Sequence, residues 1–140
     1  MKNILILCTG NSCRSQMAHG YMALFTKDLD VQVYSAGVET HGLNKRAVQV
    51  MADDGVDIAT YTSNNVAEYE LISFDYVITV CDHARDRCPY FPTKAKMIHH
   101  SFIDPAKASG SEAEIMDTFV AVRDEIKKFC MYFVKTELNC

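Results

Sequence analysis

The sequence predicts an α/β domain, a three-layer α/β/α sandwich around a four-stranded parallel sheet. Two observations carry this prediction. Short apolar runs alternate with segments of helical periodicity along the chain, as in βαβ units. In addition, Cys8, Cys81 and Asp104 each come just after a predicted strand. Because ligands of parallel α/β sheets bind at the carboxyl ends of the strands, we expect these three side chains to gather at one site.

Hydrophobic periodicity places the individual elements. The expected strands cover about 3–7, 31–35, 76–80 and 97–102, and the expected helices about 13–26, 43–54, 64–71 and 111–135. Gly55 is suited to end the second helix. The expected apolar face of the first helix consists of Met17, Tyr21, Leu24 and Phe25.

Composition indicates a globular protein with a single domain over residues 1–140. Hydrophobic residues make up 49% of the 140 residues and charged residues 23%. The net charge of −4 argues against a general binder of nucleic acid or of anionic membranes. Since no apolar run reaches transmembrane length and no signal-peptide pattern is present, we expect a cytoplasmic protein, and we expect it to be a monomer.

The stretch from Cys8 to Ser15 is the strongest chemical motif. The apolar run 4–7 ends at a thiol, a small polar loop follows, and Arg14 comes six residues after Cys8. A loop between a strand and a helix can bind a tetrahedral oxyanion through its inward backbone N–H groups. The predicted oxyanion-binding residues are therefore Thr9, Gly10, Asn11, Ser12, Cys13 and Arg14, with Arg14 as a bidentate clamp and Cys8 as a thiolate nucleophile.

This loop, with Asp104-Pro105 late in the chain, resembles the low-molecular-weight protein tyrosine phosphatase family. The resemblance is closer to the thioredoxin-coupled arsenate reductase branch of that family, and it covers essentially the whole chain. Besides the loop, the segments that carry it are 34–42 (YSAGVETHG), Val80-Cys81, Cys88-Pro89, 102–106 (FIDPA) and 122–126 (VRDEI).

The resemblance implies the first half of a reaction. Cys8 would attack arsenate held by the loop amides and Arg14, forming a thiol–arsenic adduct. Ser15 would hydrogen-bond the Cys8 sulfur, and Asp104 would act as general acid on the leaving oxygen.

The resemblance also implies how the adduct is resolved. Cys81 would attack Cys8 and release arsenite, and Cys88 would then attack Cys81. Thioredoxin would reduce the final Cys81–Cys88 disulfide. No tightly bound cofactor and no metal are implied.

A tyrosine phosphatase of the same family is the alternative function, acting through a Cys8 phosphoenzyme. It would share Cys8, Arg14 and Asp104 and would need no second thiol. After Asp104 the chain reads Pro105-Ala106-Lys107-Ala108, without the aromatic residues that such phosphatases place there. This difference favours the reductase.

Several residues also have simpler interpretations. Asp104 before a Pro is typical of a turn or helix cap. Cys81 and Cys88 could be incidental or could bind zinc with a His, although their spacing matches no common zinc pattern. We expect Cys130 to pack in the core, and we assign no role to His41, His99 and His100.

One departure from the family pattern concerns a cation. Some relatives carry, on the first helix, an acidic residue that helps to hold a potassium ion near the loop. His19 stands at that position here. The resemblance therefore leaves a potassium site in doubt.

Overall fold

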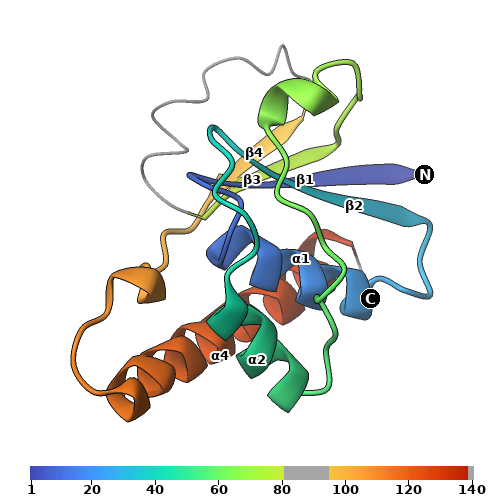
Figure 1. Ribbon diagram of the computed structural model, residues 1–140. Helices are drawn as coiled ribbons and strands as arrows, with labels where there is room; N and C mark the ends of the chain where they lie inside the picture. Colours follow the sequence, from blue (N-terminus) through green and yellow to red (C-terminus); the bar gives the residue numbers. More distant parts are fainter. Residues whose placement is uncertain (81–94, 139–140) are drawn as a thin grey trace.

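The computed structural model describes residues 1–80 and 95–138 (Figure 1). Its α-helices are α1 (Arg14–Phe25), α2 (Lys45–Asp53) and α4 (Glu112–Glu137). Two short 3-10 helices are η1 (Val66–Tyr69) and η2 (Pro105–Lys107). The strands are β1 (Lys2–Cys8), β2 (Val31–Gly37), β3 (Tyr76–Thr79) and β4 (Lys96–His99).

The four strands form one sheet in the order β2-β1-β3-β4, and all neighbours run parallel. β1 therefore lies inside the sheet, bonded on both edges. Its run Ile4 to Leu7 has no exposed surface, as expected for a strand covered on both faces. Cys8, at the carboxyl end of β1, pairs with Gly37 of β2.

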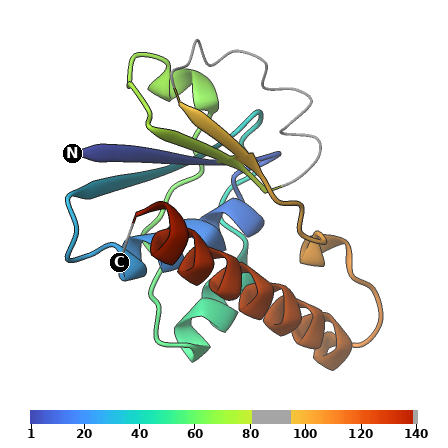
Figure 2. The same ribbon diagram turned by 180° about the vertical axis from the view of Figure 1, so that it is seen from behind.

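Adjacent residues of β2 show which elements cover each face of the sheet. The Ser35 hydroxyl lies 2.8 Å from Nδ1 of His19 on α1, whereas the Tyr34 ring lies against Tyr69 of η1, with ring centroids 5.2 Å apart. Because successive strand residues point to opposite faces, α1 and η1 lie on opposite sides. Figures 1 and 2 show α2 and α4 on the α1 side. In the described residues, the second face is covered by η1 and the chain around it rather than by an α-helix.

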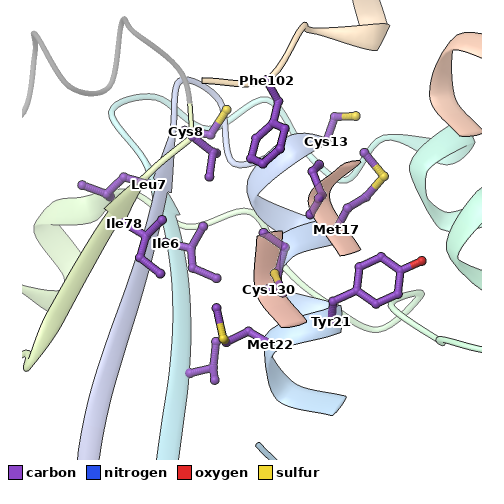
Figure 3. Close-up of a cluster of buried hydrophobic side chains, with 14 of the residues drawn as sticks. Ile6, Leu7, Cys8, Cys13, Met17, Tyr21, Met22, Ile78, Phe102 and Cys130 are labelled. Carbon is purple, nitrogen blue, oxygen red and sulfur yellow. The ribbon is translucent and has the colours of Figure 1, made fainter. Parts of the chain in front are cut away.

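In the described residues, the core lies between the sheet and the helices α1, α2 and α4. Figure 3 shows side chains of α1 and α4 meeting Ile6 and Ile78 of the sheet. Cys130 of α4 is fully buried, with its sulfur 3.7 Å from the Ala18 carbonyl oxygen of α1. The predicted packing role of Cys130 is therefore confirmed. Leu24 was wrongly placed on the apolar face: 41% of it is exposed, because it lies at the end of α1 on the side that the core does not cover.

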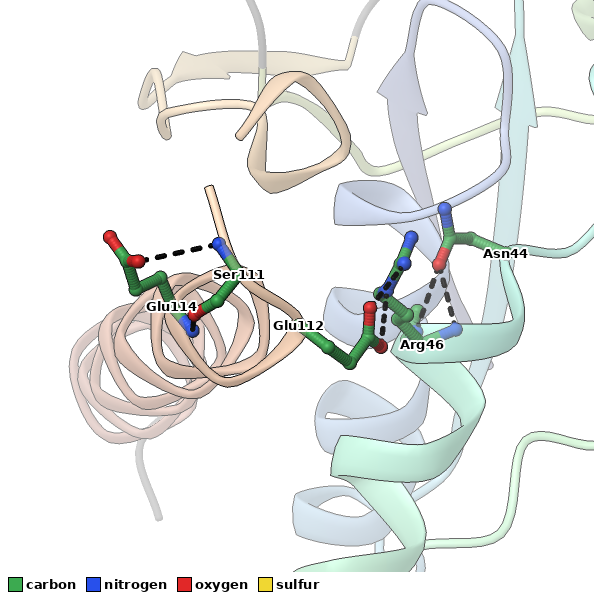
Figure 4. A network of polar contacts seen from close by, with 6 residues as sticks. Asn44, Arg46, Ser111, Glu112 and Glu114 are labelled. Atoms are coloured by element: carbon green, nitrogen blue, oxygen red, sulfur yellow. Dashed lines mark hydrogen bonds and ion pairs between the residues drawn. The ribbon is translucent and has the colours of Figure 1, made fainter. Parts of the chain in front are cut away.

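Side-chain caps fix the starts of α2 and α4. Ser111 and Glu114 form a reciprocal capping box at the start of α4, and Asn44 accepts two backbone N–H bonds at the start of α2. A bidentate bridge from Arg46 to Glu112 ties the two starts together, with its shorter N–O distance at 2.7 Å (Figure 4).

The predicted α/β class and parallel four-stranded sheet are confirmed, with element ends displaced by a few residues. The expected helix at 64–71 is only the 3-10 turn η1. Within the described ranges, no helix is both long enough and apolar enough to cross a membrane.

Candidate active site

A pocket of about 510 Å³ opens at the carboxyl end of β1. Cys8 lies in it and is 3% exposed, so its thiol faces a confined space rather than open solvent. The described lining residues are Cys8, Thr9, Gly10, Ser12, Cys13, Arg14, His41, Ser101, Asp104, Ala106 and Lys107.

The loop between β1 and α1 is held in shape through its carbonyl groups. Three of them accept backbone bonds from the connection between β2 and α2: Glu39 N–H to Thr9 O (2.9 Å), His41 N–H to Gly10 O (3.0 Å) and Asn44 N–H to Ser12 O (3.0 Å). In a planar trans peptide the C=O and the following N–H point in opposite directions. The N–H groups of Gly10, Asn11 and Cys13 are therefore turned away from that connection, as an oxyanion-binding loop requires.

Asn11 supports the loop from behind. It is fully buried and has φ of 47°, in the left-handed region that Asn tolerates better than most residues. Its side chain donates to the Ser15 hydroxyl at 2.9 Å and accepts the Asn64 N–H at 2.7 Å. Its own carbonyl accepts a bond from Gln16 Nε2 at 2.9 Å. Asn11 thus supports the loop through its side chain, a contribution beyond the backbone N–H that the sequence suggested.

Ser15 is completely buried behind the loop. Since its oxygen accepts the bond from Asn11, its own hydroxyl hydrogen is available to donate to another acceptor. The predicted bond from Ser15 to the Cys8 sulfur remains a prediction.

Gly37 allows the loop and β2 to approach each other. A Cβ at this position would lie 2.7 Å from both the Asn11 nitrogen and the Thr9 oxygen. These are backbone atoms, which cannot yield as a flexible side chain can. The packing of the loop against the last residue of β2 therefore requires glycine at position 37.

Arg14 and Asp104 meet in the pocket although they are far apart in the chain. Arg14 Nη2 lies 3.5 Å from Asp104 Oδ2, and Nη1 donates to the Phe102 carbonyl oxygen at 3.1 Å. Both side chains are largely buried. Asp104 Oδ1 also accepts the Ala106 N–H at 3.0 Å and so caps η2. The cap interpretation of Asp104 is therefore confirmed, and Asp104 also lines the pocket; its role as general acid remains a prediction.

Cys13 lines the pocket but is a poor nucleophile. Burial raises the pKa of its thiol from 9.0 to about 12, and the Asp104 carboxylate adds to the effect while Arg14 opposes it. The thiol stays protonated at neutral pH, which agrees with a lining role.

The polar lining residues that the sequence reasoning did not assign to the site are His41, Ser101 and Lys107. His41 is held over the loop by its backbone bond to Gly10 and by Glu39, whose Oε2 lies 2.7 Å from Nε2. Neither spacing nor periodicity marks these residues. The one sequence feature that could have indicated them is that each follows a strand whose carboxyl end faces the loop.

The family model described as low molecular weight phosphotyrosine protein phosphatase matches residues 3–139. The chain belongs to this family. Within it, the chain is 46% identical over 135 residues to a protein named arsenate reductase from Halalkalibacterium halodurans, covering 96% of each chain. A solved structure described as an arsenate reductase in the phosphate binding state matches with a TM-score of 0.77 at 25% identity, covering 96% of this chain and 97% of that one. A low molecular weight protein tyrosine phosphatase from T. tengcongensis shares the fold, with a TM-score of 0.81 at 23% identity over 96% of this chain and 99% of that one.

The second and third thiols predicted for this member of the phosphatase family, Cys81 and Cys88, lie outside the described residues. The chain leading to them is described. Val80 is buried, and its N–H donates to the Leu7 carbonyl oxygen at 2.9 Å. Position 80 therefore lies beside the end of β1, next to the residue that precedes Cys8.

In some relatives a potassium ion lies near the loop, and the corresponding position in this chain is beside His19. A pocket of about 210 Å³ there is lined in part by Gln16, whose Oε1 is a buried acceptor without a hydrogen-bond partner in the described structure. Burial lowers the pKa of His19 from 6.5 to about 4, so its ring is neutral at pH 7. The ring contacts Ser35 and packs on Tyr61. No carboxylate is among the described lining residues, so a cation would meet no anionic ligand.

Proposed function

We propose that this protein reduces arsenate to arsenite. The observation that carries the proposal is the 46% identity to an arsenate reductase over 96% of both chains. The pocket supports it chemically, since a buried thiol, a loop of inward N–H groups and a guanidinium surround one space. Such a space suits a tetrahedral oxyanion.

In the proposed first step, the Cys8 thiolate attacks arsenic and forms a sulfur–arsenic bond. The loop N–H groups and Arg14 stabilise the negative oxygens as the geometry at arsenic changes. Asp104 gives its proton to the oxygen that leaves as water. Ser15 stabilises the Cys8 thiolate from behind the loop.

In the proposed second step, the Cys81 thiolate attacks the Cys8 sulfur. A Cys8–Cys81 disulfide forms, the sulfur–arsenic bond breaks, and its electron pair stays on arsenic, which leaves as arsenite. Cys88 then attacks Cys81 and frees Cys8. A dithiol of the thioredoxin type reduces the Cys81–Cys88 disulfide and restores the enzyme.

Weak hydrolysis of phosphate esters is an expected side activity, because a loop that holds arsenate also holds a phosphoryl group. Asp104 would again act as general acid, protonating the leaving oxygen of the ester while the Cys8 phosphoenzyme forms. The wall after Asp104 carries Ala106 and Lys107 rather than an aromatic ring, which favours a free oxyanion over an aryl ester.

The Cys88→Ser variant tests the proposed function directly. With arsenate, thioredoxin, thioredoxin reductase and NADPH, the native enzyme is expected to turn over continuously. Cys88→Ser is expected to stop after about one turnover, with a Cys8–Cys81 disulfide visible by mass spectrometry.

The matched control is Cys140→Ser, which removes a thiol that the relay does not use and is expected to turn over normally. Sustained turnover by Cys88→Ser would refute the relay. Hydrolysis of an aryl phosphate is expected to survive the loss of both Cys81 and Cys88.

We further propose a monomer that acts in the cytoplasm and binds neither nucleic acid nor membranes. The net charge of −4 supports the last two points. The relay supports a reducing compartment, because its thiols must be regenerated after each cycle.

We also propose that the protein needs no tightly bound cofactor and no alkali cation. The neutral His19 ring, in contact with Ser35 and Tyr61, supports this. The melting temperature is therefore expected to be the same in KCl and in NaCl, and His19→Glu is expected to make it depend on the cation, whereas His19→Gln is not. A rise specific to KCl in the native protein would contradict the proposal.

A further inference from the structure

Asp104 occupies one of the two positions on Arg14 that an oxyanion needs. Arg14 Nη1 is anchored on the Phe102 carbonyl oxygen, and Nη2 faces Asp104 Oδ2 at 3.5 Å. Arg14 Nε is buried and has no hydrogen-bond partner in the described part of the chain.

The Nε–H and one Nη2–H of a guanidinium lie along the same edge and form the fork that binds two oxygens of an oxyanion. In this structure Nε is unpaired and Nη2 is held by a carboxylate. An oxyanion that takes the whole fork must therefore displace Asp104 from Nη2. Nη1 can keep its bond to Phe102 during this exchange.

The charges in the pocket determine what happens to Asp104 next. Lys107, His41 and the thiols of Cys8 and Cys13 line the same pocket, and His41 is itself engaged by Glu39. Once displaced, Asp104 would lose the guanidinium N–H and stand beside a dianion. A carboxyl group beside like charge favours its protonated form.

We propose that oxyanion binding displaces Asp104 from Arg14 and that Asp104 takes up one proton from solvent in the same event. No bond of the oxyanion breaks in this step: a carboxylate and a proton become a carboxylic acid. The inference rests on the proposed function, since the acid formed is the one that later protonates the oxygen leaving arsenic. Substrate binding thus supplies the general acid with its proton.

Sulfate binding measured by calorimetry tests this proposal. Sulfate does not titrate near neutral pH, and a Cys8→Ser background removes the nucleophilic thiol as a proton acceptor. Titrations in buffers of different ionisation enthalpy give the number of protons taken up per sulfate bound. We expect uptake that approaches one proton at some pH between about 5 and 7.

The decisive comparison is Cys8→Ser/Asp104→Asn. Asn keeps the oxygen that accepts the Ala106 N–H, so η2 stays capped, but it cannot take up a proton. Sulfate is expected to bind this variant without proton uptake, whereas Cys8→Ser/His41→Gln is expected to keep the uptake. Absence of uptake by Cys8→Ser across the pH range, or uptake that persists in Cys8→Ser/Asp104→Asn, would overturn the proposal.

The result is independent of arsenate reduction, because sulfate is not reduced. An enzyme that takes up the proton but does not reduce arsenate refutes the proposed function alone. An enzyme that reduces arsenate but binds sulfate without proton uptake refutes only the coupling.

Discussion

Replacing Arg14 with Lys is expected to lower kcat/KM for arsenate by about 10²- to 10³-fold. Lys keeps the positive charge but cannot form a fork with two parallel N–H groups. It also cannot hold the Phe102 carbonyl oxygen, which Arg14 Nη1 reaches at 3.1 Å, while contacting an oxyanion at two points. Steady-state kinetics with thioredoxin in excess measure the effect.

Arg46→Lys is the matched control for this prediction. Arg46 also makes a bidentate contact, to Glu112, but on an exposed surface formed by the starts of α2 and α4. The same change of side chain there is expected to leave kcat/KM within about twofold, since exposed ion pairs contribute little. A loss of similar size in both variants would show that Arg14 acts through general stability rather than at the oxyanion.

Replacing Asn11 with Ala is expected to destabilise the protein by about 2–4 kcal/mol. The variant leaves the Asn64 N–H and the Ser15 hydroxyl without their buried partner. It also forces Ala to adopt the positive φ of 47°. The free energy of unfolding in urea measures the loss, and arsenate turnover is expected to fall with it because the loop loses its support.

Two further substitutions separate the causes of this loss. Asn11→Gly removes the same hydrogen bonds but tolerates positive φ, so it is expected to be less destabilised than Asn11→Ala. Asn11→Asp keeps an acceptor for the Asn64 N–H but cannot donate to Ser15, and is expected to lie between Ala and the native protein. If Asn11→Ala were as stable as Asn11→Gly, backbone strain at position 11 would not contribute to the loss of stability.

Local patterns were sufficient to predict the elements that hold Cys8. The run 4–7 is buried on both faces, so it appears as an uninterrupted apolar stretch, and α1 follows directly after a loop of small residues. The position of Cys8 at the junction followed from these two facts. Asp104 was expected at the same site because it follows a predicted strand, and it does reach the pocket.

What could not be predicted depends on contacts between distant segments. Asn11 appeared as one loop residue among several, since its bond to Asn64 arises only when the chain after α2 packs on the loop. His41 and Lys107 reach the pocket because of how the strands are ordered, which periodicity does not reveal. The error at Leu24 has the same origin. Helical spacing predicts which side chains share one face of α1, but it does not predict how much of the length of that face is covered by the rest of the core.

The long-range bonds of the oxyanion loop bear on the order in which the protein folds. The loop is bonded to residues 53 positions away in Asn64 and Ser63, and Arg14 to a residue 88 positions away in Phe102. Contacts of such long sequence separation require large loops to close first, so they form slowly. The oxyanion site is therefore expected to form late in folding, after the local contacts of the helices.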